Sequence, residues 1–125
     1  MAELNMDCVR NLLLFIEQNQ RYKENGKIVT IKMKHIRHQM EDWSYEDLYE
    51  AAKYICAEKL VTCVGGPQGK APSQYIFDGI TPLGHKAIAA MKNDTAWKKA
   101  KPNLLFFAQK GIDSLIQFLI ASAVQ

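Results

Sequence analysis

The sequence predicts a mainly α-helical domain of the α+β class, a winged helix-turn-helix with a small three-stranded wing sheet and additional C-terminal helices. Apolar residues recur at helical spacing along most of the chain, which indicates amphipathic helices. Three short runs rich in β-branched or aromatic residues interrupt this pattern and are typical of strands. The last two runs flank a loop rich in glycine and proline and follow a helix, which is the order of a recognition helix and its wing.

The first part of the chain is expected to form a helix, a turn, a strand and a second helix. Apolar residues at helical spacing in NMDCVRNLLLFIEQNQ predict the first helix, and Asn5 or Asp7 can cap its start. The stretch KENGK supplies a turn because Gly26 can take a positive φ. Residues 27–31 then predict one short strand, and residues 32–40 predict a short basic helix.

The middle of the chain is expected to form the recognition helix and the wing. A third helix is predicted over residues 45–59, with Ser44 as its N-cap. Residues 60–64 and 73–77 predict two strands around the loop GGPQGKAP. Thr81 is expected to cap a further helix whose first residue is a proline, a position where the missing N–H costs nothing.

Length, composition and cysteine content indicate one globular domain of a reducing compartment. The chain has 125 residues, of which 48% are hydrophobic and 23% charged, values that exclude a disordered or low-complexity chain. The net charge of +3 does not by itself indicate a nucleic-acid binder, although residues 51–102 carry eight Lys or Arg residues and only three acids. Cys8, Cys56 and Cys63 form no CxxC pair and are expected to be reduced, buried small hydrophobes. The acidic N-terminus lacks the basic flank of a signal peptide, so we expect a cytoplasmic protein.

No class of enzyme is indicated by the motifs. His35 and His38 share a helix face and could bind one metal ion, but no third ligand follows at a suitable spacing. The stretch GGPQGKA lacks the phosphate-loop pattern, because Ala71 stands where a Ser or Thr hydroxyl would bind Mg²⁺. No Ser–His–Asp or Cys–His arrangement was found. We therefore expect a protein without catalytic activity, cofactor, metal site or small-molecule substrate.

Two stretches, MDCVRNLLLFIEQN and ITPLGHKAIAAMKNDTAWKKAK, carry a resemblance to a family. The chain resembles an uncharacterised bacterial and prophage family, domain-of-unknown-function family 2513, over roughly its whole length to Lys101. The family pattern falls on Met6, Asp7, Val9, Arg10, Leu12, Leu13, Ile16, Glu17, Ile80, Thr81, Gly84, His85, Ile88, Met91, Lys92, Asp94, Trp97 and Lys99. Pro82 and Ala89 depart mildly from it. The resemblance implies a winged-helix-like fold and a mobile-element origin, and it implies no activity.

One functional hypothesis is a DNA-binding regulator, the commonest use of this shape. The predicted recognition helix suits DNA poorly, because Glu46, Asp47 and Glu50 would bring three negative charges to the phosphate backbone. The basic groups lie instead on the second helix, on the wing tip and near Trp97. The predicted DNA-binding residues are Lys32, Lys34, Arg37, His38, Lys70, Lys98 and Lys99.

The other hypothesis is a protein-interaction module that binds a host or phage protein. Tyrosine is a preferred interface residue because its ring is large and its hydroxyl can be hydrogen-bonded. The predicted outward face of the third helix combines such rings with charges, through Tyr45, Glu46, Tyr49, Glu50, Lys53 and Tyr54. The sequence leaves both hypotheses open.

An apolar C-terminal helix is predicted at residues 102–125, beyond a winged-helix domain at residues 1–101. A helix that is apolar around so much of its circumference must be buried against something. Lys110 and Asp113 lie in its middle and disfavour membrane insertion. We expect burial against the same helix of a second chain, as in a homodimer, through Leu104, Ile112, Leu115, Ile116, Leu119 and Ile120.

Overall fold

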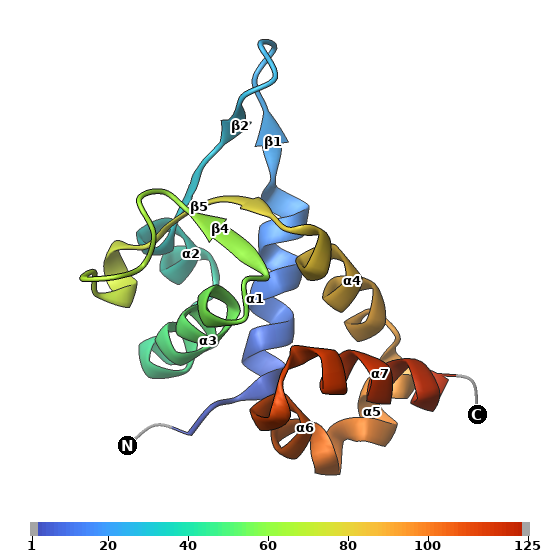
Figure 1. The fold of residues 1–125 in the computed structure, drawn as a ribbon. Helices are drawn as coiled ribbons and strands as arrows, with labels where there is room; N and C mark the ends of the chain where they lie inside the picture. The colour runs from blue at the N-terminus through green and yellow to red at the C-terminus, as the bar shows by residue number, and fades with distance from the viewer. Residues whose placement is uncertain (1–2, 124–125) are drawn as a thin grey trace.

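The structure is a computed structural model that describes residues 3–123 (Figure 1). The two residues at each end, which include the end of the predicted last helix, lie outside the described residues. The helices are α1 (Met6–Asn19), α2 (Met33–Gln39), α3 (Tyr45–Ala57), α4 (Pro82–Met91), α5 (Asp94–Ala100), α6 (Leu104–Lys110) and α7 (Ile112–Ala123). The strands are β1 (Arg21–Tyr22), β2 (Ile28–Val29), β3 (Ile31–Lys32), β4 (Val61–Cys63) and β5 (Ile76–Ile80), and short 3-10 turns occur at Pro72–Gln74 and Lys101–Asn103. The chain is therefore mainly helical with a small antiparallel sheet, as predicted.

Helix α1 forms the centre of the molecule, with α2 and α3 on one side of it and α4 on the other (Figure 1). The side chains of Val9, Leu12 and Leu13 are fully buried there, as the helical spacing of apolar residues predicts. Asn5 caps α1, and its side chain accepts a hydrogen bond from the backbone N–H of Cys8. The predicted N-caps Ser44 of α3 and Thr81 of α4 are confirmed by the same type of bond.

The three-stranded sheet has the order β3-β5-β4, and all its pairs are antiparallel. Ile31 of β3 lies opposite Phe77 of β5, whose side chain is buried in the core. Strand β4 pairs with the other edge of β5, and the pairing register shifts between Thr62 and Cys63. Strands β4 and β5 therefore form a hairpin. The element order β3, α2, α3, β4, β5 is the order that the sequence predicts.

A second hairpin, formed by β1 and β2, was not predicted. Arg21 pairs with Val29 and Tyr22 with Ile28, and Gly26 in the connecting turn has a φ of 86°. The prediction of one strand over 27–31 is wrong, because β2 pairs back with β1 whereas β3 pairs with β5. The hairpin projects from the rest of the molecule beyond the end of α1 (Figure 1).

The C-terminal segment is two helices and not one. Gly111, with a φ of 135°, separates α6 from α7, a conformation that residues with a side chain rarely adopt. The two helices pack on each other, and the rings of Phe107 and Phe118 stack with 4.3 Å between their centroids. Helix α7 also packs on α4 and α5 of the same chain.

This packing buries most of the tail within a single chain, and the expected burial against a second chain stays a prediction. Within the single chain, Leu115 and Leu119 are fully buried, and Leu104, Ile112 and Ile116 are at most 5% exposed. Ile120 is the exception among the six predicted oligomerisation residues, with half of its surface exposed. The tail shares one hydrophobic core with α1 and α4. No helix in residues 3–123 is long and apolar enough to cross a membrane.

Candidate nucleic-acid interface

Helix α2 presents an almost wholly basic face to solvent. Its apolar residues Met33 and Ile36 are fully buried, which turns the intervening positions outward. Lys34, Arg37 and His38, three of the predicted DNA-binding residues, are exposed there, together with His35. Lys32, at the N-terminal end of the helix, is exposed as well. Four of the predicted DNA-binding residues are therefore exposed close together in the chain.

The unpredicted β1–β2 hairpin extends this basic face. Arg21, Lys23 and Lys27 are all exposed on it, and Glu24 is the one acid among residues 20–40. A groove lined by Val29 of β2, Lys32 of β3 and His35 of α2 joins the base of the hairpin to α2. We call the combined face the basic surface and define it as Arg21, Lys23, Lys27, Lys32, Lys34 and Arg37. Sequence reasoning missed the hairpin half, although a glycine turn between short β-forming pairs is a hairpin signal.

Arg37 connects the two predicted sites. Its guanidinium lies 5.6 Å from the ring centroid of Tyr45 and 5.5 Å from that of Tyr49, both on α3. It also donates a hydrogen bond of 2.8 Å to the Tyr49 hydroxyl. Cation–π contacts of this kind hold a cation in place without neutralising its charge. The basic surface therefore continues onto the tyrosine face of α3, and the two hypotheses share one region.

The outward face of α3 is smaller than the sequence predicted. Tyr45, Glu46 and Lys53 are exposed, whereas Tyr49 and Glu50 are half-buried. The assignment of Tyr54 to this face is wrong, because its hydroxyl donates a hydrogen bond of 3.2 Å to the backbone carbonyl of Ala108 in α6. Burial, with a smaller contribution from a neighbouring carboxylate, raises the pKa of Tyr54 well above its usual range. The tail, which the sequence treated as separate, covers this side of α3.

The remaining predicted DNA-binding lysines do not join the basic surface. Lys70, on the loop between β4 and β5, donates a hydrogen bond of 3.1 Å to the carbonyl of Val64 and is half-buried. Lys98 and Lys99 are exposed on α5, which lies at the opposite end of the molecule from the β1–β2 hairpin (Figure 1).

Residues of the two quoted sequence stretches meet where α1 packs against α5. The indole N–H of Trp97 donates a hydrogen bond of 2.7 Å to the carboxylate of Asp7, and the buried ring lies under the guanidinium of Arg10. Arg10 also donates to the carbonyl of Met91, at the end of α4, and forms an ion pair with Asp94. The hydrogen bond from Arg10 lowers the pKa of the Asp94 carboxyl.

Other residues of these stretches hold α4 in place. Glu17 of α1 forms an ion pair with Lys92, at 2.8 Å. Gly84 lies so close to the chain before β4 that an added Cβ would be 2.0 Å from the carbonyl oxygen of Leu60. The hydroxyl of Thr81 donates to the carbonyl of Lys59. The two stretches are therefore a framework that joins α1 to α4 and α5, and the end of α1 leads directly into Arg21 of the basic surface.

The family model described as "Hypothetical protein (DUF2513)" matches residues 3–111 of this chain. The chain belongs to this family. The match includes both stretches of the framework, the basic surface and α6. The comparison with curated proteins found no match, and neither did the comparison with solved structures.

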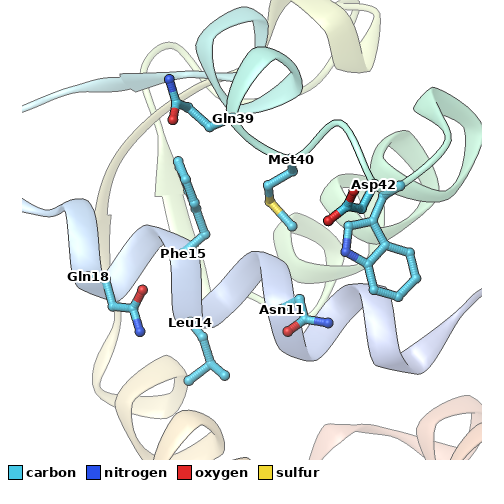
Figure 2. Close-up of a pocket in the computed structure, with 8 residues that line it drawn as sticks. Asn11, Leu14, Phe15, Gln18, Gln39, Met40 and Asp42 are labelled. Atoms are coloured by element: carbon cyan, nitrogen blue, oxygen red, sulfur yellow. The ribbon is translucent and has the colours of Figure 1, made fainter.

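The DUF2513 chain also has an open groove of about 520 Å³ between α1 and the end of α2 (Figure 2). Polar amides line it, from Asn11 and Gln18 on α1 and from Gln39 on α2, beside the apolar Phe15 and Met40. This combination provides hydrogen-bonding groups and apolar contacts, with a carboxylate at one edge. Among residues 3–123, no group of three His, Cys, Asp or Glu residues could hold a metal ion.

Proposed function

We propose that this DUF2513 protein is a winged helix-turn-helix regulator that binds duplex DNA through its basic surface. The observation that carries the proposal is the placement of six Lys or Arg residues on the β1–β2 hairpin and α2, with Glu24 as the one acid in that stretch. Clustered cations bind a phosphate backbone by releasing its condensed counterions. A projecting hairpin beside a basic helix offers two points of contact along one duplex.

The element order supports the winged helix-turn-helix assignment. The helix pair α2–α3 follows the short strand β3 and precedes the hairpin formed by β4 and β5. The sheet order β3-β5-β4 places β5, the second strand of that hairpin, next to β3. In such domains the second helix of the pair usually enters the major groove. Here the first turn of that helix contains Glu46 and Asp47, so α2 and the hairpin are the proposed phosphate contacts. The binding is therefore expected to depend weakly on base sequence.

The cellular setting belongs to the same proposal. A regulator encoded by a mobile element and acting in the bacterial cytoplasm is consistent with the family resemblance, because the resembling proteins are bacterial and prophage-borne. We propose no catalytic role, cofactor or small-molecule substrate for the protein.

A lysine-protection experiment tests the proposal directly. The intact protein is treated with an amine-acetylating reagent, with and without a random duplex, and the modified positions are read by mass spectrometry. We expect the duplex to protect Lys23, Lys27 and Lys34 while leaving Lys86 and Lys98 as reactive as before, because the last two lie on α4 and α5. Equal protection of all five lysines, or protection of none, would contradict the proposal.

A second function is supported by the tyrosine face of α3. Tyr45 is 56% exposed although it is large and aromatic, and Arg37 holds it beside Tyr49. Rigid tyrosine rings flanked by charges, here Glu46 and Lys53, are typical of protein interfaces. A host or phage protein is the alternative partner of this region. Affinity capture from host lysate, with and without nuclease, distinguishes the two: a partner that survives nuclease and is lost in Tyr45→Ala favours the protein interface.

A further inference from the structure

Two of the three cysteines lie side by side, although the sequence predicted three separate buried thiols. The sulfur of Cys56, near the end of α3, is 3.0 Å from the sulfur of Cys63 in β4. Both residues are half-buried, whereas Cys8 is fully buried in α1. The sequence did not predict the pair because the two residues belong to different elements and form no CxxC motif.

The turn between α3 and β4 brings the two sulfurs together. Lys59 reverses the chain with a φ of 57°, and the backbone N–H of Leu60 bonds back to the carbonyl of Ile55. The register shift between Thr62 and Cys63 then sets the direction of the Cys63 side chain relative to the rest of β4. The approach of the two thiols is therefore a property of the local fold.

The surroundings make the two thiols chemically unequal. The hydrogen bond between the two sulfurs lowers the pKa of Cys63, and the charge of Lys70 acts in the same direction against burial and Asp78. The same hydrogen bond, together with burial, raises the pKa of Cys56. Burial also raises the pKa of Cys8, to about 12. Cys63 is thus the thiol best suited to act as a nucleophile.

We propose that Cys56 and Cys63 are a redox modification site that forms a reversible intramolecular disulfide when the protein meets a hydroperoxide. The Cys63 thiolate attacks one oxygen of hydrogen peroxide, the O–O bond breaks, and the hydroxide that leaves takes a proton to become water. The Cys56 sulfur then attacks the sulfur of the Cys63 sulfenic acid, and the departing hydroxide leaves as water with the Cys56 proton. Two thiols lose two electrons in total and the peroxide gains them. An external dithiol reverses the reaction by thiol–disulfide exchange.

The fold can accommodate the bond with little movement. A disulfide requires the sulfurs to approach to about 2.05 Å, a shift of roughly 1 Å that side-chain rotation can supply. Strand β4 lies at the edge of the sheet, and the loop after it contains Gly65 and Gly66, both with positive φ.

The test uses the full-length reduced protein, hydrogen peroxide and intact-mass analysis with alkylation of the remaining thiols. We expect the monomer to lose two hydrogen atoms, and a non-reduced peptide map to join Cys56 to Cys63 while Cys8 stays alkylatable. Treatment with dithiothreitol should restore the original mass. Oxidation of the pair should be at least about tenfold faster than any oxidation of Cys8, because reactivity follows thiolate fraction and exposure.

Three serine variants complete the test. Cys8→Ser should still form the bond, Cys63→Ser should lose it, and Cys56→Ser should accumulate a sulfenic acid at Cys63 that a dimedone probe captures. A bond that includes Cys8, a disulfide between two chains, or oxidation of the pair no faster than of Cys8 would overturn the proposal. The readout is mass alone, so the result does not depend on whether the protein binds DNA.

Discussion

Removing cations from the basic surface should change how DNA binding depends on salt. The surface contains six Lys or Arg residues, and each phosphate that a cation neutralises contributes about −0.9 to the slope of log affinity against log salt. If all six make such contacts, the slope is about −5, and affinity for a random duplex falls about a thousandfold between roughly 50 and 200 mM salt. This is the largest effect that the geometry allows.

Two triple-alanine variants measure how much of that slope comes from each half of the basic surface. One removes the α2 group, Lys32, Lys34 and Arg37. The other removes the hairpin group, Arg21, Lys23 and Lys27. Each is expected to reduce the slope to about −2.7, so that affinity falls only about fortyfold over the same salt range. Fluorescence anisotropy of a labelled duplex at a series of salt concentrations measures both slopes, and circular dichroism checks that each variant is folded.

The matched control is the double variant Lys86→Ala with Lys98→Ala, which removes two exposed lysines from α4 and α5. Its slope should equal that of the unmodified protein. If the control lowers the slope as much per lysine as the triple variants do, net charge and not the basic surface determines binding. Binding that is independent of salt would refute the reasoning altogether.

Three further predictions concern the framework and the C-terminal tail. Gly84→Ala should lower the free energy of unfolding by about 3 kcal/mol, measured in urea, because the new methyl group would meet the backbone carbonyl of Leu60. An unchanged free energy of unfolding would contradict the close approach of Gly84 to Leu60. Trp97→Phe should cost about 2 kcal/mol in the same assay, because the carboxylate of Asp7 loses its indole donor, and Asp7→Asn, which keeps an acceptor, should cost less. A chain that ends at Pro102 should lose cooperative thermal unfolding, because α7 covers part of the core formed by α4 and α5; a truncated chain that unfolds cooperatively would mean that the tail is a separate unit.

Local signals in the sequence determined where several of the helices begin. The caps Asn5, Ser44 and Thr81 predicted where three helices begin, because a side-chain oxygen before a helix satisfies one of its unpaired N–H groups. The alternation of apolar and charged positions in α2 likewise predicted which side chains are exposed. These features depend on neighbours a few residues away, which is the range that spacing and turn chemistry describe.

Tertiary structure alone decided which element covers which face. The sequence predicted that the tail must be buried, but not that Gly111 would fold it back onto its own chain. The same long-range packing turned Tyr54 from a predicted surface residue into a hydrogen-bond donor to α6, and brought Cys56 against Cys63. Periodicity identifies an apolar face without identifying its partner, because the partner is chosen by the free energy of packing the whole chain.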